Sequence, residues 1–275
     1  MTGMDIESQI IVLFDEQGTP TFQPDRETDC FLGVAVTYDL TEEKEIFSSC
    51  SELFGLSKTK PFKNRHINNA RAERISDLVI KLPIQIVVRS VKLNNEEFQY
   101  VLTVYEQLGN ELRKKHRHIG ERNIAQILYS EILVETVFTS ITDYMESHLA
   151  DSAISIYLDN HSFPKDDIKI HLKDWAQAIQ VDVDSFYEKL GPNINVRTAS
   201  ISLMTQDTPR KRFVDVITSA VSRYFLREDS IRFSHVPLEI LLKNNVNSCK
   251  DITQTTMDFT RHLMDHMLRD HPLVN

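Results

Sequence analysis

The sequence has few cysteines and no pattern that would bring them together. Cys30, Cys50 and Cys249 are the three cysteines among 275 residues, and no Cys-x-x-Cys pair occurs. A zinc cluster or a disulfide framework would need clustered or regularly spaced cysteines, so neither is predicted. Such sparse cysteine usage is typical of a reducing compartment.

Long hydrophobic runs are missing as well. The sequence contains no stretch of about 18 apolar residues, the length that a membrane-spanning helix needs. The opening residues, MTGMDIESQIIVLFDEQG, lack the basic flank and the long apolar segment of a signal peptide. We therefore expect no membrane association and a cytoplasmic location.

Glycine and proline are scarce, with 7 and 9 residues, and neither an internal repeat nor a low-complexity linker is present. Hydrophobic residues make up 41% of the chain and charged residues 26%. This balance is typical of globular proteins and excludes fibrous and disordered classes. A chain of this length buries a substantial core, either as one large domain or as a domain with an elaboration.

Basic residues are outnumbered by acidic residues, 31 to 40, and the formal net charge is -9. Indiscriminate binding to nucleic acid is therefore not expected, because neutralising phosphates requires cations. Basic residues nevertheless gather in three runs: Lys58, Lys60, Lys63, Arg65, Arg71 and Arg74; Arg113, Lys114, Lys115, Arg117 and Arg122; and Arg210, Lys211 and Arg212. A single run is usually a solvated helix end or loop, whereas three runs together are compatible with a local basic track.

Hydrophobic periodicity predicts alternating strands and helices. The predicted strands cover residues 8–15, 30–38, 84–93, 153–159 and 195–204, and the first two form an antiparallel hairpin. The predicted helices cover 41–56, 68–81, two stretches within 95–149, two pieces within 165–190, 209–224 and 237–271. This order predicts an α/β fold in which helices pack on a mixed central sheet.

Three aspartates occupy comparable places in this pattern. Asp15 and Asp159 come at the carboxyl ends of predicted strands, and Asp215 lies in the first turns of the last core helix. Strand ends form the ligand crevice of open α/β sheets. Converging carboxylates repel one another unless a cation lies among them, and their hard oxygen atoms select Mg²⁺ or Mn²⁺. The alternative is that acids after strands are ordinary turn residues.

Four segments resemble, in order, motifs of one known family. VLFDEQGTP followed by FLGVAV resembles the Asp-Glu-Ser-Gly start of a bacterial and phage family known as domain of unknown function 3800, which has an RNase H-like fold. PFKNRHINNARAERISDLVIKLPIQIVVRSVKL resembles its Glu-x-Lys, helix and strand segment. ISIYLDN resembles its central acid-terminated strand, and RKRFVDVITSAVSRYF its closing Leu-Gln-Leu-Ala-Asp helix. The resemblance touches most of residues 9–227.

The resemblance implies roles for individual residues. Asp15, Asp159 and Asp215 would bind the metal, Lys63 would contact phosphate or a charged partner in the site, and Glu16 would face away from it. It also implies an RNase H-like domain over residues 1–230, with a helical insertion at 95–150, followed by a helical C-terminal tail over 231–275.

The chain departs from the family's motifs at three positions. Gln17 replaces serine, Pro61 stands where the glutamate before the lysine is usual, and Arg212 replaces glutamine. The acid missing at Pro61 would weaken a metal site, and Asp207, on the loop before the last core helix, is a candidate substitute.

These observations together predict a divalent-metal-dependent nuclease that uses Mg²⁺ or Mn²⁺ and water as the nucleophile. Its nucleic-acid contacts would come from Lys63, Arg65, Arg210 and Arg212. The helical insertion, whose junction carries RKKHRH, would form a wall or clamp for the strand. Such a nuclease would suit a phage-defence or mobile-element system.

Two other functions are compatible with the same sequence. One is a degenerate RNase H-like module, without catalysis, that binds a protein or nucleic-acid partner. The other is a metal-independent ribonuclease built on an Arg-x4-His pair, for which Arg113 with His118 and Arg261 with His266 are candidates. No phosphate-binding loop, dinucleotide fingerprint, nucleophile elbow or kinase signature occurs.

Overall fold

The fold is described from a computed structural model. It describes residues 8–17, 29–56, 69–94, 96–104, 107, 123–147, 152–159, 176–177, 179–185, 188, 196–204, 208–225 and 246–270. The fold class predicted from the sequence, α/β with a mixed sheet, is confirmed for these residues.

Six strands form one mixed sheet in the order β5-β4-β1-β2-β3-β6. Their bounds are β1 Ser8–Gln17, β2 Asp29–Asp39, β3 Gln85–Leu93, β4 Ser152–Leu158, β5 Val196–Leu203 and β6 Val246–Asp251. The first three strands are antiparallel to one another in succession, which confirms the predicted hairpin. On the other side of β1, strands β4 and β5 run parallel to it, and β6 runs parallel to β3 at the opposite edge.

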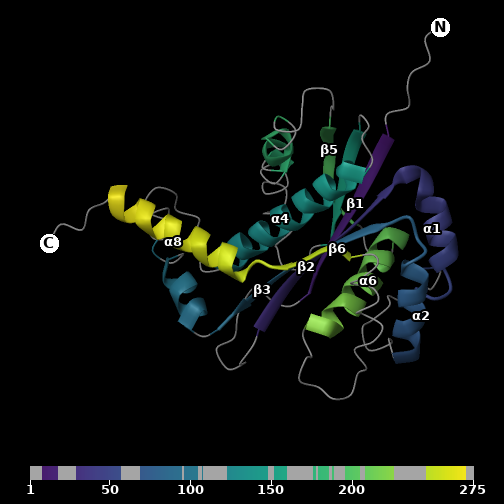
Figure 1. Cartoon of the computed structure of the whole chain (residues 1–275), viewed down its shortest axis with the longest axis horizontal. Coiled ribbons are helices and arrows are strands. Elements are labelled where there is room, and N and C mark those ends of the chain that lie inside the picture. Colours follow the sequence, from purple (N-terminus) through teal and green to yellow (C-terminus); the bar gives the residue numbers. More distant parts are fainter. Residues whose placement is uncertain are drawn as a thin grey trace, which may run out of the picture.

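Helices cover both faces of the sheet (Figure 1). Helix α4, Asn123–Ser147, packs on one face against β1, β2 and β3. On the other face lie α1, Glu43–Cys50, α2, Asn69–Val79, and α6, Pro209–Phe225. A short 3-10 helix, Leu40–Glu42, precedes α1, and α8, Thr253–Asp270, follows β6.

Strand β1 is apolar on both faces because helices bury each side. Ile10, Val12 and Phe14 join the core under α4, whereas Ile11 and Leu13 join the core under α6. Such continuous hydrophobic runs are typical of strands that are covered on both faces. The alternation also determines that Asp15, the next residue after Phe14, belongs to the face that α6 covers.

Gly33 on β2 allows α4 to approach the sheet closely. A Cβ atom at this position would lie 2.5 Å from Cγ2 of Ile132 and 2.9 Å from Oγ1 of Thr136. The helix therefore rests on the strand backbone itself. Since α4 supplies much of the core on this face, this part of the predicted 95–150 insertion is a layer of the domain. The RKKHRH junction lies outside the described residues.

The predicted helix over residues 237–271 is wrong in part. Residues 246–251 form strand β6, which pairs with β3, and helix begins only at Thr253. The segment VNSCKD has no helical periodicity of apolar residues, and the open edge of β3 supplies its backbone hydrogen-bond partners. This part of the predicted tail thus belongs to the sheet.

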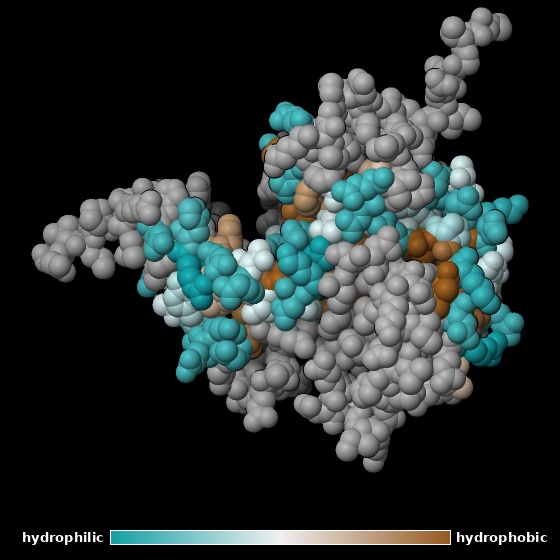
Figure 2. All heavy atoms as spheres, in the orientation of Figure 1, coloured by the Kyte–Doolittle hydropathy of each residue, from teal (hydrophilic) through white to brown (hydrophobic). Residues whose placement is uncertain are grey.

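The described residues on the face that Figure 2 shows are mainly polar. Figure 2 shows hydrophilic side chains over most of the coloured area, with small hydrophobic areas between them. Val181 and Phe259 are large hydrophobic residues that stay exposed among those described. In the described part of the chain, no helix combines the length and the hydropathy that crossing a membrane would require.

Candidate metal centre

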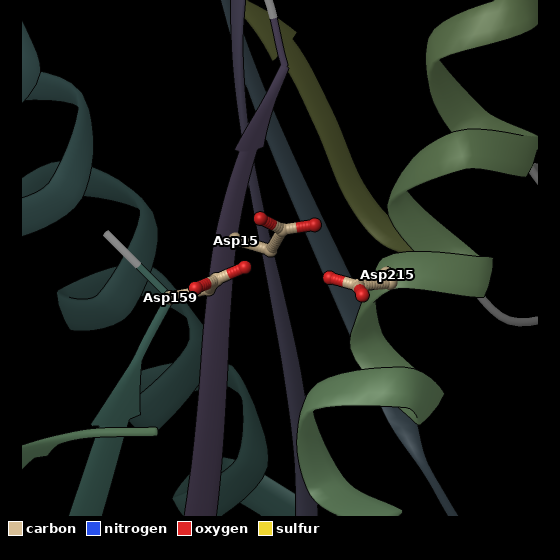
Figure 3. Close-up of side chains that lie close together, drawn as sticks. All are labelled: Asp15, Asp159 and Asp215. Carbon is tan, nitrogen blue, oxygen red and sulfur yellow. The ribbon is translucent and has the colours of Figure 1, made fainter. Parts of the chain in front are cut away.

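Three aspartates from separate elements converge at the carboxyl ends of the central strands β1 and β4 (Figure 3). Asp15 lies near the end of β1, Asp159 directly follows β4, and Asp215 lies in α6. One carboxylate oxygen from each residue lies within 4.8 Å of those from the other two. We call these three residues the acid site. All three residues are candidates from the sequence, and the structure brings them together.

The sheet positions two of the acids. Strands β1 and β4 are parallel neighbours, so their carboxyl ends lie side by side, with Phe14 opposite Leu158. The backbone N–H of Asp159 continues this pairing by donating to the carbonyl oxygen of Phe14 at 2.9 Å. The ligand crevice of open α/β sheets forms at such carboxyl ends.

Helix α6 supplies the third acid. It begins at Pro209, a residue that suits the first turn of a helix because it needs no intrahelical N–H bond there. Phe213, Val214 and Ile217 are buried in the core that α6 shares with the sheet. Asp215 lies among these anchoring residues, so packing of the helix against β1 and β2 determines where its carboxylate is held.

The acids lie close together and are buried or partly buried. Asp15 is 8% exposed and Asp159 5%, whereas Asp215 is partly buried. Burial, and then the charges of Asp215 and Asp159, raise the pKa of Asp15 well above its usual range. The Thr218 hydroxyl and the Glu16 amide, which donates to Oδ1 of Asp15 at 2.9 Å, act in the opposite direction.

The pKa of Asp215 is raised as well. Burial raises its pKa to about 7, and the charge of Asp159 and a hydrogen bond to that residue add to the effect, while Lys211 opposes it. An ionised carboxylate loses hydration when it is buried and is repelled by its neighbours. The acid site therefore favours positive charge, either as protons or as a metal cation.

Lys211 is a member of the site that the sequence analysis missed. Its Nζ donates to both carboxylate oxygens of Asp159, at 2.6 Å each, and the residue is only 8% exposed. In the sequence, Lys211 is part of a basic run for which no role in the site was predicted. A signal was present, because Lys211 and Asp215 are four residues apart and thus share one face of the helix.

The two arginines beside Lys211 are engaged within the protein. Arg210 donates through Nε to Oε2 of Glu43 at 2.7 Å, and its guanidinium lies 4.3 Å from the centroid of the Tyr157 ring. Arg212 is buried and donates to the carbonyl oxygen of Leu56 at 2.9 Å. These contacts connect α6 to α1, to β4 and to the turn after α1. Nucleic-acid contacts of Arg210 and Arg212 stay a prediction.

Several other residues that the sequence singles out are not described by the structure. Lys63, Arg65, Pro61 and Asp207 fall outside the described residues, as do Arg113 and His118. By the alternation along β1, Glu16 belongs to the face of the sheet that α4 covers. Burial raises the pKa of Tyr129 on α4, and the charge of Glu16 adds to this effect. Arg261 is exposed on α8, and its guanidinium donates to Asp258 at 2.6 Å.

No protein-family model matches the chain, and a search of curated proteins finds no significant match. The geometry of the acid site is therefore the basis for a functional proposal.

Proposed function

We propose that this chain is a divalent-metal-dependent nuclease that hydrolyses phosphodiester bonds in nucleic acid. One observation carries the proposal. Three carboxylates from β1, β4 and α6, distant in sequence, lie within 4.8 Å of one another at the carboxyl edge of a central strand pair. Their burial is unfavourable without a cation, so the arrangement fits a cation-binding role better than a structural one.

The sheet topology supports a fold of the RNase H-like type. Three sequential antiparallel strands, β1 to β3, are followed by β4 and β5, which add in parallel on the other side of β1. The acids stand on the central pair β1 and β4 and on the helix that follows β5. The order of strands and acids along the chain agrees with the resemblance to domain of unknown function 3800.

The donor set fits Mg²⁺ or Mn²⁺. All three side chains offer carboxylate oxygen atoms, which are hard ligands, and the described surroundings contribute no thiolate. Asp15, Asp159 and Asp215 would hold the ion. When bound, such an ion lowers the pKa of a water molecule and stabilises the leaving oxygen of a phosphodiester.

The chain's own residues keep these ligands in place. The Glu16 amide donates to Asp15, and Lys211 holds both oxygen atoms of Asp159, so two of the three carboxylates have restricted orientations. Asp215 is fixed by the helix backbone between buried neighbours. Ligands that are oriented before binding lose less entropy when the ion and the substrate arrive.

A cleavage assay tests the proposal. Purified protein is incubated with single- and double-stranded DNA and RNA in Mg²⁺ or Mn²⁺, with and without EDTA, and compared with Asp159→Asn. The matched control is Asp77→Asn, an exposed aspartate on α2. We expect cleavage that EDTA and Asp159→Asn abolish and that Asp77→Asn preserves.

Two results would contradict the metal mechanism. Cleavage that survives both EDTA and Asp159→Asn would direct attention to Arg113 and His118. The absence of both cleavage and metal binding would favour the non-catalytic binding module. One feature favours that second candidate: Lys211 already neutralises Asp159, so part of the site is balanced without a metal.

A further inference from the structure

A lysine, Lys211, lies inside the acid site and is bonded to one of its carboxylates. Lys211 Nζ lies 2.6 Å from each oxygen of Asp159, and the side chains of this ion pair are 10% and 7% exposed. Short hydrogen bonds from an ammonium to both carboxylate oxygens are charge-assisted and strong. A positive charge is thus part of the site as the chain folds.

The formal charges of the three carboxylates and of Lys211 indicate how many divalent ions the site favours. Three carboxylates and one ammonium leave two negative charges, which one divalent ion balances. A second divalent ion would leave a net positive charge of two in a largely buried site, which is electrostatically costly. The charge balance therefore favours one ion.

The position of Lys211 agrees with this count. Sites with two metal ions hold them roughly 3.5–4 Å apart and use shared carboxylates between them. In Figure 3, Asp159 and Asp215 lie on either side of Asp15. Both oxygens of Asp159 are already bonded to Lys211, so the ammonium takes the place next to Asp159 where a second ion would bind.

We propose that Lys211 serves as a built-in cation of the acid site, so that the site binds a single divalent ion, with Lys211 in place of a second. This inference rests on the proposed function and specifies its metal stoichiometry. Lys211 acts as a positioning residue, since it holds Asp159 and sets the charge that the ligands present to the ion.

The experiment counts ions on the full-length protein. Mn²⁺ is titrated by calorimetry, and the paramagnetic resonance of bound Mn²⁺ reports whether two ions are coupled. The wild-type chain is compared with Lys211→Met, with Lys211→Arg, which keeps the charge, and with Lys250→Gln. Lys250 is an exposed lysine on β6, three strands away from β1 in the sheet.

We expect the wild type, Lys211→Arg and Lys250→Gln to bind one ion per chain. Lys211→Met is expected to bind two, with resonance broadened by coupling between neighbouring ions. Two ions in the wild type, or one ion in Lys211→Met, would overturn the inference while leaving a metal-dependent nuclease intact. No ion in any of the four proteins would contradict the proposed function itself.

Loss of a buried ion-pair partner destabilises proteins, so Lys211→Met is checked for folding by circular dichroism. Should it fail to fold, the wild-type stoichiometry still decides the question, because two coupled ions in that protein would overturn the inference. A single uncoupled ion there, retained in Lys211→Arg, would support it.

Discussion

Replacing Asp215 by asparagine is expected to stabilise the metal-free protein above neutral pH. Burial and the charge of Asp159 raise the pKa of Asp215 from 3.8 to about 7. Asparagine removes the carboxylate charge, has nearly the same shape, and keeps an N–H donor that can bond to Asp159. The variant therefore resembles the protonated form of Asp215 at every pH.

The direction of the pKa change determines how the stability gain of Asp215→Asn depends on pH. Because the pKa in the folded protein lies above the unfolded value, ionisation favours unfolding. The contribution of protonated Asp215 to stability is fully present below about pH 4 and is lost as the pH rises through about 7. The stability difference between variant and wild type should therefore grow between these values and stay constant above them.

The size of the stability gain follows from the unfolded and folded pKa values of Asp215. The difference between 3.8 and about 7 corresponds to an upper limit of about 4 kcal/mol, at about 1.36 kcal/mol per pH unit. Because Asp215 keeps some contact with water, screening reduces the expected gain to about 2 kcal/mol. For a chain of this size, that gain raises the melting temperature by roughly 4–8 °C.

Thermal unfolding followed by circular dichroism provides the assay. Wild type, Asp215→Asn and the exposed control Asp77→Asn are compared in EDTA at pH 4 and pH 8. We expect Asp215→Asn to melt higher at pH 8, with little difference at pH 4, and Asp77→Asn to match the wild type. An unchanged or lower melting temperature of Asp215→Asn at pH 8 would refute the argument from carboxylate repulsion.

Bound Mn²⁺ should reverse the order of the melting temperatures of the wild type and Asp215→Asn at pH 8. Mn²⁺ at about 100 times its dissociation constant stabilises a protein that binds it by about 2.7 kcal/mol. The wild type should gain this stabilisation, whereas Asp215→Asn, which lacks one ligand, should gain much less. Equal stabilisation of both proteins by Mn²⁺ would show that Asp215 does not hold the ion.

Three further substitutions test other parts of the structure by denaturant unfolding. Gly33→Ala should destabilise the fold by about 1–3 kcal/mol, because its methyl group would collide with Ile132. Phe213→Ala should cost about 3–5 kcal/mol, since this buried ring stacks on Phe54 at a centroid distance of 5.4 Å. Glu131→Gln should stabilise the protein by about 1–2 kcal/mol at pH 8 and hardly at all near pH 4, because burial raises the pKa of Glu131 to about 7. No change for any one of them would contradict the packing or burial described at that residue.

The sequence was sufficient for most of the sheet because strong local signals coincide there. The strands β1, β2 and β4 are long apolar runs that end at turn residues or acids, so their periodicity is unambiguous. Strand β6 has one large apolar residue in six and exists because β3 offers it an edge, which is a tertiary effect. Local patterns do not contain that information.

The acid site could be predicted in part for a related reason. Asp15 and Asp159 mark strand ends, and strand ends in α/β sheets gather in space, so their positions along the chain imply proximity. Asp215 was grouped with them because it lies in the first turns of the last core helix, and the resemblance implied the same role for it. The bond between Lys211 and Asp159 joins residues 52 positions apart, and it depends on the rotation of α6 over the sheet. That rotation results from the packing of Phe213 and its neighbours in the core.

The energetics of the site support the proposed cation ligand independently of any resemblance. The apolar faces of β1 bury side chains against helices on both sides, which stabilises the strand whether or not its last residues are acidic. Asp15 and Asp215 weaken the metal-free fold, because burial and mutual repulsion raise the pKa of both. Two buried acids and one partly buried acid lie beside one lysine, so the carboxylates outnumber the ammonium, and residues that lower stability in this way are typical of functional centres. The gain expected for Asp215→Asn without metal and its loss with Mn²⁺ are two consequences of that same excess of carboxylates.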